Sequence, residues 1–256
     1  MKPLAERLKR TLLTLPDAEL RVGWLADKLR SLPSAEAARA LDSLCEDAES
    51  HASEAREVLV TIALLLAAMA DQAWVDELRA HAGAERLLCL DRLIRRGPPA
   101  SEPPLRPDAA PIPDYGAGRE LSLGERRSLA RRPSRQQFER LLADPHPLVI
   151  EQLLLNPKLT EADVVRLVTR RPARAELIRS VARSPRWLCR ERVRLAILNN
   201  PGAPAEVAIP LLGLCTRRQL QELVHAADGR PVVRRTALEL LERRPPLGPP
   251  HEQPLQ

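Results

Sequence analysis

Aromatic residues are scarce in this chain: they make up 2% of the 256 residues, with one Phe, one Tyr and three Trp. The 44% of hydrophobic residues must therefore build a core mainly from Ala, Leu, Val and Ile, a set that suits closely packed helices. We expect an all-α protein. The same scarcity argues against single-strand nucleic-acid binding, because such proteins stack bases on aromatic side chains.

Glycine is also rare, with ten residues, and the chain has no Gly-rich phosphate loop, no nucleophile elbow and no His-Glu-x-x-His motif. Asp144 and His146 flank Pro145 and could be taken for an acid and base pair. A similar loop 40 residues later, which enters the next copy of the internal repeat described below, has Ser184 and Arg186 at these positions, and they cannot do that chemistry. We therefore expect no enzymatic activity, no cofactor and no metal.

Cysteine and long apolar runs are limited too. The four cysteines (Cys45, Cys89, Cys189 and Cys215) lie far apart without a Cys-x-x-Cys pair, so we expect reduced core residues in a cytoplasmic protein. The N-terminus lacks the apolar stretch of an export signal. The longest apolar run, residues 58–70, is shorter than the roughly 20 residues of a membrane span. It predicts a buried helix, with a membrane-surface role as the minor alternative.

Positive charge is concentrated in the second half and comes almost entirely from arginine, because only four of the 40 basic residues are lysine. Residues 1–96 carry 14 basic and 16 acidic residues, whereas residues 121–244 carry 24 and 13, a balance of +11. A basic domain favours anionic partners such as nucleic acid or an acidic protein surface.

Composition divides the chain into four segments. Apolar residues at helical spacing, with breaks at positions 15–16, 32–33, 50–53 and 82–83, predict a bundle of five or six helices at the N-terminus. A Pro-rich linker should let the two halves act semi-independently, and the Pro-rich tail should be disordered. The expected segments are a helical bundle at 1–96, a linker at 97–120, helical repeats at 121–244 and a tail at 245–256.

An internal repeat appears when the sequence is shifted by 44 residues. Residues 149–157 then align with 193–201, and both copies end in Asn-Pro (Asn156-Pro157 and Asn200-Pro201). A third, truncated copy begins at Val233. Capping boxes, in which a hydroxyl and a later polar side chain satisfy the first backbone groups of a helix, predict helix starts at Ser122 with Glu125, Ser134 with Gln137, and Thr160 with Asp163.

Residues 121–244 resemble the HEAT-like, leucine-rich-repeat-variant class of bacterial α-solenoids. The resemblance is carried by the two Asn-Pro helix ends, by the Val-Arg helix starts at Val193 and Val233, and by the run of residues 159–164. It implies a short C-terminal HEAT-like α-solenoid, in which stacked repeats share one core and expose a curved surface. Families of this class are mostly binding scaffolds.

The candidate binding residues lie late in two successive units. Arg190 and Arg194 are one turn apart and should share an exposed face, whereas Val193 and Ile197 should face the core. Arg and Trp are enriched at binding hot spots. The candidate set is Arg170, Arg171, Arg174, Trp187, Arg190 and Arg194.

Several interpretations of this set remain open. The arginines could be an ordinary solvated face and Trp187 a core residue between repeats. Our leading hypothesis is a non-catalytic scaffold whose basic solenoid binds another protein through an acidic surface, and the alternative is binding to the phosphate backbone of nucleic acid. A third hypothesis, an enzyme on helical repeats such as a DNA-base glycosylase or a chromophore lyase, needs a pocket carboxylate beside an aromatic residue. No pair in the sequence compels it.

Overall fold

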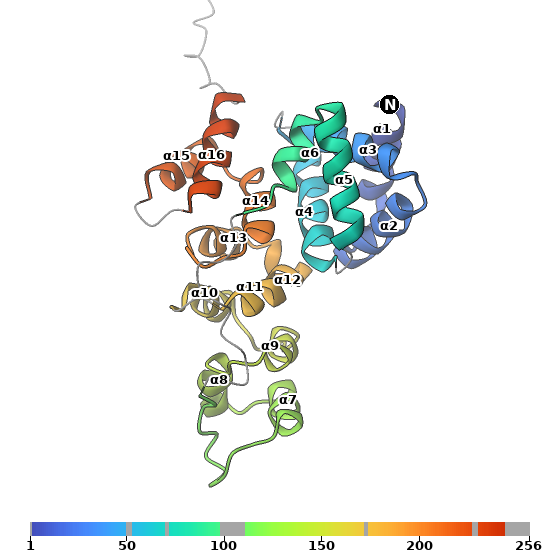
Figure 1. Cartoon of the computed structure of the whole chain (residues 1–256). Helices are drawn as coiled ribbons and strands as arrows, with labels where there is room; N and C mark the ends of the chain where they lie inside the picture. The colour runs from blue at the N-terminus through green and yellow to red at the C-terminus, as the bar shows by residue number, and fades with distance from the viewer. Residues whose placement is uncertain are drawn as a thin grey trace, which may run out of the picture.

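The computed structural model describes residues 2–49, 53–69, 72–97, 111–171, 174–226 and 230–243. Within these ranges the chain forms sixteen helices and no strand, as the composition predicted. Figure 1 shows α7–α16 as an elongated stack, with α1–α6 beside the end that carries the later helices. None of the described helices combines the length and apolar character needed to cross a lipid bilayer.

The N-terminal segment forms six helices, within the predicted range. Leu8, Leu12, Leu25 and Leu29 are each 0–1% exposed, so the apolar stripes form the inner faces of α1 and α2. Asp17 begins α2 by accepting hydrogen bonds from the first backbone N–H groups. The helices are α1 (Lys2–Thr14), α2 (Ala18–Arg30), α3 (Ser34–Glu49), α4 (Ser53–Ala68), α5 (Gln72–Glu85) and α6 (Leu88–Leu93).

The predicted break at positions 82–83 is wrong, because α5 continues to Glu85. Gly83 is exposed and weakens a helix by about 1 kcal/mol relative to alanine, but Leu78 and Ala82 are buried beside it and hold the turn in place. The helix is followed by Arg86, which adopts a positive φ of 55°.

The second half consists of ten helices, most of them eight or nine residues long. All three predicted capping boxes are present, and Thr216 with Gln219 forms a fourth at the start of α15. The helices are α7 (Leu123–Arg131), α8 (Arg135–Leu142), α9 (Pro147–Leu154), α10 (Glu161–Thr169), α11 (Ala175–Ala182), α12 (Pro185–Leu188), α13 (Glu191–Leu198), α14 (Ala205–Leu212), α15 (Arg217–His225) and α16 (Pro231–Arg243).

The 44-residue periodicity corresponds to helices. The aligned segments 149–157 and 193–201 fall on α9 and α13, and the same shift of 44 residues places α10 on α14. The helices stack on one another: α7 packs on α9, α9 on α11, α10 on α13 and α14 on α16. Val193 and Ile197 are fully buried, as predicted for the inner face of α13.

The two halves pack together, a question that the sequence left open. Helix α4, which contains the long apolar run and is buried as predicted, contacts α11, α12 and α14, and the buried residues of both halves form one core cluster. The approach is close: a Cβ on Gly97 would lie 2.6 Å from the Cβ of Ala205 on α14. Residues 98–110 of the predicted linker, and the tail at 245–256, lie outside the described residues.

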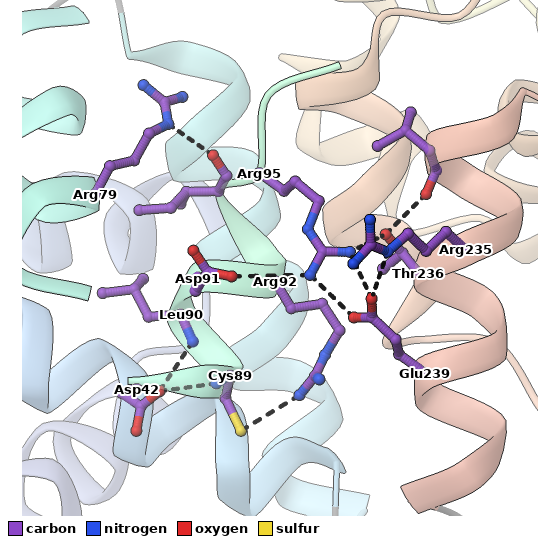
Figure 2. Close-up of polar contacts among 12 residues, drawn as sticks. Asp42, Arg79, Cys89, Leu90, Asp91, Arg92, Arg95, Arg235, Thr236 and Glu239 are labelled. Carbon is purple, nitrogen blue, oxygen red and sulfur yellow. Dashed lines mark hydrogen bonds and ion pairs between the residues drawn. The ribbon is translucent and has the colours of Figure 1, made fainter. Parts of the chain in front are cut away.

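Ion pairs join α6 to α16 at this junction (Figure 2). Arg95 donates two hydrogen bonds to the carboxylate of Glu239, at 2.9 and 3.0 Å. Burial raises the pKa of Glu239, but the hydrogen bonds from Arg95 and Arg235 and the charges of Arg95 and Arg92 together outweigh burial, so this pKa lies below its ordinary value. Nearby, Glu49 of α3 binds Arg92 at 2.8 Å and Arg243 of α16 at 3.5 Å. The junction is therefore both apolar and ionic.

The cysteines follow the prediction at three of four positions. Cys45, Cys89 and Cys215 are buried and form no disulfide with another described cysteine, as expected for reduced core residues. Cys189 is also free but exposed, which corrects the prediction. It follows the very short helix α12, whose buried residues are Trp187 and Leu188, so the chain turns outward at Cys189.

Candidate functional site

Three of the predicted arginines come together around a cavity of about 100 Å³ in the stack. Arg170, Arg171 and Arg174 line it, on the segment that leads from α10 to α11. Leu142, at the end of α8, contributes to the opposite wall, and Asn200, after α13, also lines the cavity. Four helices, α8, α10, α11 and α13, therefore shape the site, which forms only when these helices pack together.

Each arginine is held differently. Arg170 donates from its guanidinium to the carbonyl oxygen of Leu142 at 2.8 Å, which leaves its other N–H donors available. Arg174 directly precedes α11, and its side chain has no hydrogen bond or ion pair to any residue in the described ranges. Both side chains are half-buried.

The electrostatic environment of Arg170 is unfavourable to its own charge. Burial lowers the pKa of Arg170, the negative charge of Glu139 opposes this effect, and the positive charges of Arg166 and Arg174 add to it. Glu139 itself is an ion-pair partner of Arg166, at 2.8 Å. The single negative charge of Glu139, which is already paired with Arg166, does not balance the positive charges around Arg170. The cavity therefore keeps an excess of positive charge.

The one carboxylate among the described lining residues, Asp144, is already neutralised. Its side chain is fully buried and accepts two hydrogen bonds of 2.8 Å from the guanidinium of Arg126. The hydroxyl of Tyr115 donates to it at 2.5 Å, and the backbone N–H of His146 donates at 2.8 Å. Burial and the bond to Asp144 raise the pKa of Tyr115. Asp144 therefore does not cancel the charge of the cavity arginines.

This cluster includes a pocket carboxylate beside an aromatic residue, the pair that an enzyme on helical repeats would require. The lone pairs of Asp144 are occupied by Arg126, Tyr115 and a backbone group. The Nδ1 atom of His146 is not available as a base beside Asp144, since it accepts the backbone N–H of Leu148 at the start of α9. The geometry is that of a structural ion pair that anchors residues 111–120 to the stack.

A second cavity, of about 170 Å³, adjoins the first and shares Arg171 and Asn200 with it. Arg230, just before α16, contributes another guanidinium, which is fixed by donation to the carbonyl oxygen of Ala203. No carboxylate occurs among the described residues that line this second cavity. The two cavities form one arginine-lined depression across the stack, which we call the arginine pocket.

The other two predicted arginines lie elsewhere. Arg190 is exposed at the start of α13, and Arg194 donates to the carbonyl oxygens of Leu188 and Cys189 at 3.0 and 2.8 Å. Charges of Arg21 in α2 and of Glu57 in α4 act on Cys189 together with those of Arg190 and Arg194. These two arginines therefore lie near the N-terminal bundle and outside the arginine pocket.

Trp187 is 3% exposed and lies inside the stack. Its indole N–H donates to the carbonyl oxygen of Leu154 at 2.9 Å, and the Arg186 guanidinium lies 4.4 Å from the centre of its ring. Arg186 in turn donates to the carbonyl oxygen of Asn156 at 2.9 Å. The indole joins α12 to α9 and is not accessible to a partner.

Sequence reasoning missed Arg230 and Asn200 as members of the pocket, and Tyr115 as a buried residue. Asn200 carried a signal, because it is one of the two repeated Asn-Pro helix ends. Arg230 carried none, since it reaches the pocket only through the packing of α16 on α14. No group of three or more His, Cys, Asp or Glu residues in the described ranges could hold a metal ion.

Comparison with known proteins adds no assignment, because no family model, curated protein or solved structure matches this chain.

Proposed function

We propose that this protein is a non-catalytic binding scaffold, a HEAT-like helical stack that binds another protein through an acidic surface. One observation supports the proposal above the others. Arg170, Arg171 and Arg174 line one cavity whose described lining residues include a single carboxylate, and that carboxylate, Asp144, is already bound by Arg126. Like many arginines of this chain, Arg170 and Arg174 form no ion pair within the part of the chain that the structure describes.

A half-buried arginine loses part of its hydration, and the carbonyl oxygens that Arg170 and Arg194 bind do not supply a compensating negative charge. Burial lowers the pKa of both Arg170 and Arg194, in agreement with this loss. A protein partner that brings carboxylates can restore the missing hydrogen bonds, and bidentate pairing suits the planar guanidinium group. The same groups would also accept phosphates, so nucleic acid is the alternative that an experiment must separate.

The test is affinity capture from native lysate with the full chain as bait, with and without nuclease, followed by quantitative mass spectrometry. The variant Arg170→Glu/Arg174→Glu changes the arginine pocket. The variant Arg132→Glu/Arg192→Glu makes the same change in charge at two exposed positions outside the pocket. Arg132 follows the last residue of α7, and Arg192 lies in α13.

We expect a protein that survives nuclease, is captured by wild type and by the control variant, and is lost with the pocket variant. Recovery that depends on nucleic acid would replace this function with the alternative. Equal recovery by both variants would contradict a role for the pocket arginines.

A further inference from the structure

We infer that the arginine pocket is a binding site for an extended acidic peptide segment that places one side-chain carboxylate in each of its two cavities. This inference rests on the proposed scaffold function and identifies the part of the partner that is recognised. It makes Arg170 and Arg174 the ligands of one carboxylate and Arg230 a ligand of a second, with Asn200 between them.

Each cavity has room for a side-chain carboxylate. Volumes of about 100 and 170 Å³ hold several water molecules, and both cavities are open to solvent. A carboxylate can therefore enter together with part of its hydration. The phosphates of nucleic acid carry the same sign of charge, so the experiment below compares the peptide with a DNA duplex.

The available donors match a carboxylate. Arg174 has no partner within the described ranges, and Arg170 uses one nitrogen for the carbonyl oxygen of Leu142. The Asn200 amide donates to the carbonyl oxygen of Val168 at 2.5 Å and its side-chain oxygen accepts from Gly202. Both ends of the Asn200 amide are therefore held by hydrogen bonds within the protein, so Asn200 lines the cavities as a fixed, uncharged residue. The arginines provide the charge.

Apolar side chains line part of both cavities. Leu177 and Ile178 line the first cavity, and Leu223 and Val233 line the second. Charge-assisted hydrogen bonds are strengthened when water is excluded, because the local dielectric constant falls. A peptide carboxylate that binds beside these apolar side chains therefore forms stronger hydrogen bonds than one at a fully exposed arginine.

The groups that oppose binding are few. Glu139 is the acidic residue whose charge acts on Arg170, and it pairs with Arg166 at an exposed position. Asp144 is neutralised by Arg126. The net field in the pocket therefore remains positive, and added salt should weaken binding moderately, by screening the exposed part of the field.

The experiment measures fluorescence anisotropy of a labelled hexaglutamate peptide with the full-length protein, alongside a hexaglutamine peptide and a labelled DNA duplex. The pocket variants are Arg174→Gln and Arg230→Gln. Arg192→Gln removes the same charge from an exposed position of α13 and is the matched control. Arg174→Lys keeps the charge but removes the guanidinium, so it separates the contribution of charge from that of the planar hydrogen-bonding group.

We expect hexaglutamate to bind and hexaglutamine not to bind. Affinity should fall at least tenfold in Arg174→Gln and in Arg230→Gln, less than twofold in Arg192→Gln, and to an intermediate extent in Arg174→Lys. Thermal unfolding of each variant shows whether it is folded. Equal weakening in Arg174→Gln and Arg192→Gln would overturn the inference, because it indicates diffuse surface charge. Tighter binding of the duplex with the same arginine dependence would also overturn it.

The outcome is separable from that of the proposed function. If lysate capture depends on the pocket arginines but hexaglutamate does not bind, this inference fails and the scaffold function stands. If hexaglutamate binds in the pocket but no protein is captured, the peptide site stands and the scaffold function fails.

Discussion

Asn156 and Asn200, which are 44 positions apart, perform the same task in successive parts of the stack. The amide of Asn156 donates to the carbonyl oxygen of Arg131, in the last turn of α7, at 3.1 Å. That of Asn200 donates to the carbonyl oxygen of Val168, in the last turn of α10. Each side-chain oxygen accepts the backbone N–H two residues later. Each asparagine therefore satisfies the free end of a neighbouring helix.

Replacing Asn200 with alanine should destabilise the stack by about 1–3 kcal/mol, because a buried carbonyl oxygen loses its donor. Asn199 is the matched control: it is adjacent and exposed, and it bonds only within its own helix. Urea unfolding of both variants measures the difference in unfolding free energy. A loss in Asn199→Ala as large as that in Asn200→Ala would contradict the assigned role.

The substitution Asp144→Asn should lower the unfolding free energy by about 3–5 kcal/mol, since it leaves the charge of Arg126 buried and unpaired. Arg126 is 5% exposed, and its Nε already has no hydrogen-bond partner. Asp163→Asn, in an exposed capping box, should lower it by only about 1 kcal/mol. Similar denaturation midpoints for the two variants would refute the importance of the buried pair.

Acid should weaken the contact between the two halves of the protein, because protonation of Glu239 removes the charge that Arg95 binds. Because the pKa of Glu239 is lowered in the folded protein, its contribution is complete above the unfolded value of about 4.3 and is lost as pH falls through the folded value. Glu239→Gln should reduce stability near neutral pH by about 1 kcal/mol. The gap to wild type should close toward pH 3 in denaturation curves. Glu242→Gln, an exposed position on the same helix, should show no such pH dependence.

One thiol should react with a maleimide in the native protein. Cys189 is exposed, whereas Cys45, Cys89 and Cys215 are buried. Burial, together with the charge of Glu49, raises the pKa of Cys89 to about 12, which suppresses its reactive thiolate. Mass spectrometry of the labelled protein should show a single fast adduct that disappears in Cys189→Ser. A second fast adduct would show that the junction opens readily.

Helix starts were predictable because capping is local. Ser122 and Thr160 define their helices through residues three positions away, and Thr216 obeys the same rule although it was not identified. The break assigned at Gly83 was wrong because burial of neighbouring residues outweighs the weak helix propensity of one exposed glycine.

Contacts distant in sequence were not predictable. Arg56 donates to the carbonyl oxygen of Leu214, 158 residues away, across the junction. Nothing in either local segment specifies this partner. The same reason limited the site: Arg170 and Arg174 are close in sequence and could be grouped, whereas Arg230 joins them only after α14, α15 and α16 have packed.

The one-sided attachment of the N-terminal bundle has a mechanical consequence. Helix α4 contacts α11, α12 and α14, whereas α7 and α8 lie at the far end of the stack (Figure 1). The stack is thus held by the N-terminal bundle at α11, α12 and α14, and its early helices α7 and α8 extend from there as a free arm. Leu142 belongs to the free arm and Asn200 to the clamped part, and both line the same cavity. Any bending of the arm must therefore change the width of the cavity, and a ligand that bridges its walls would stiffen the arm.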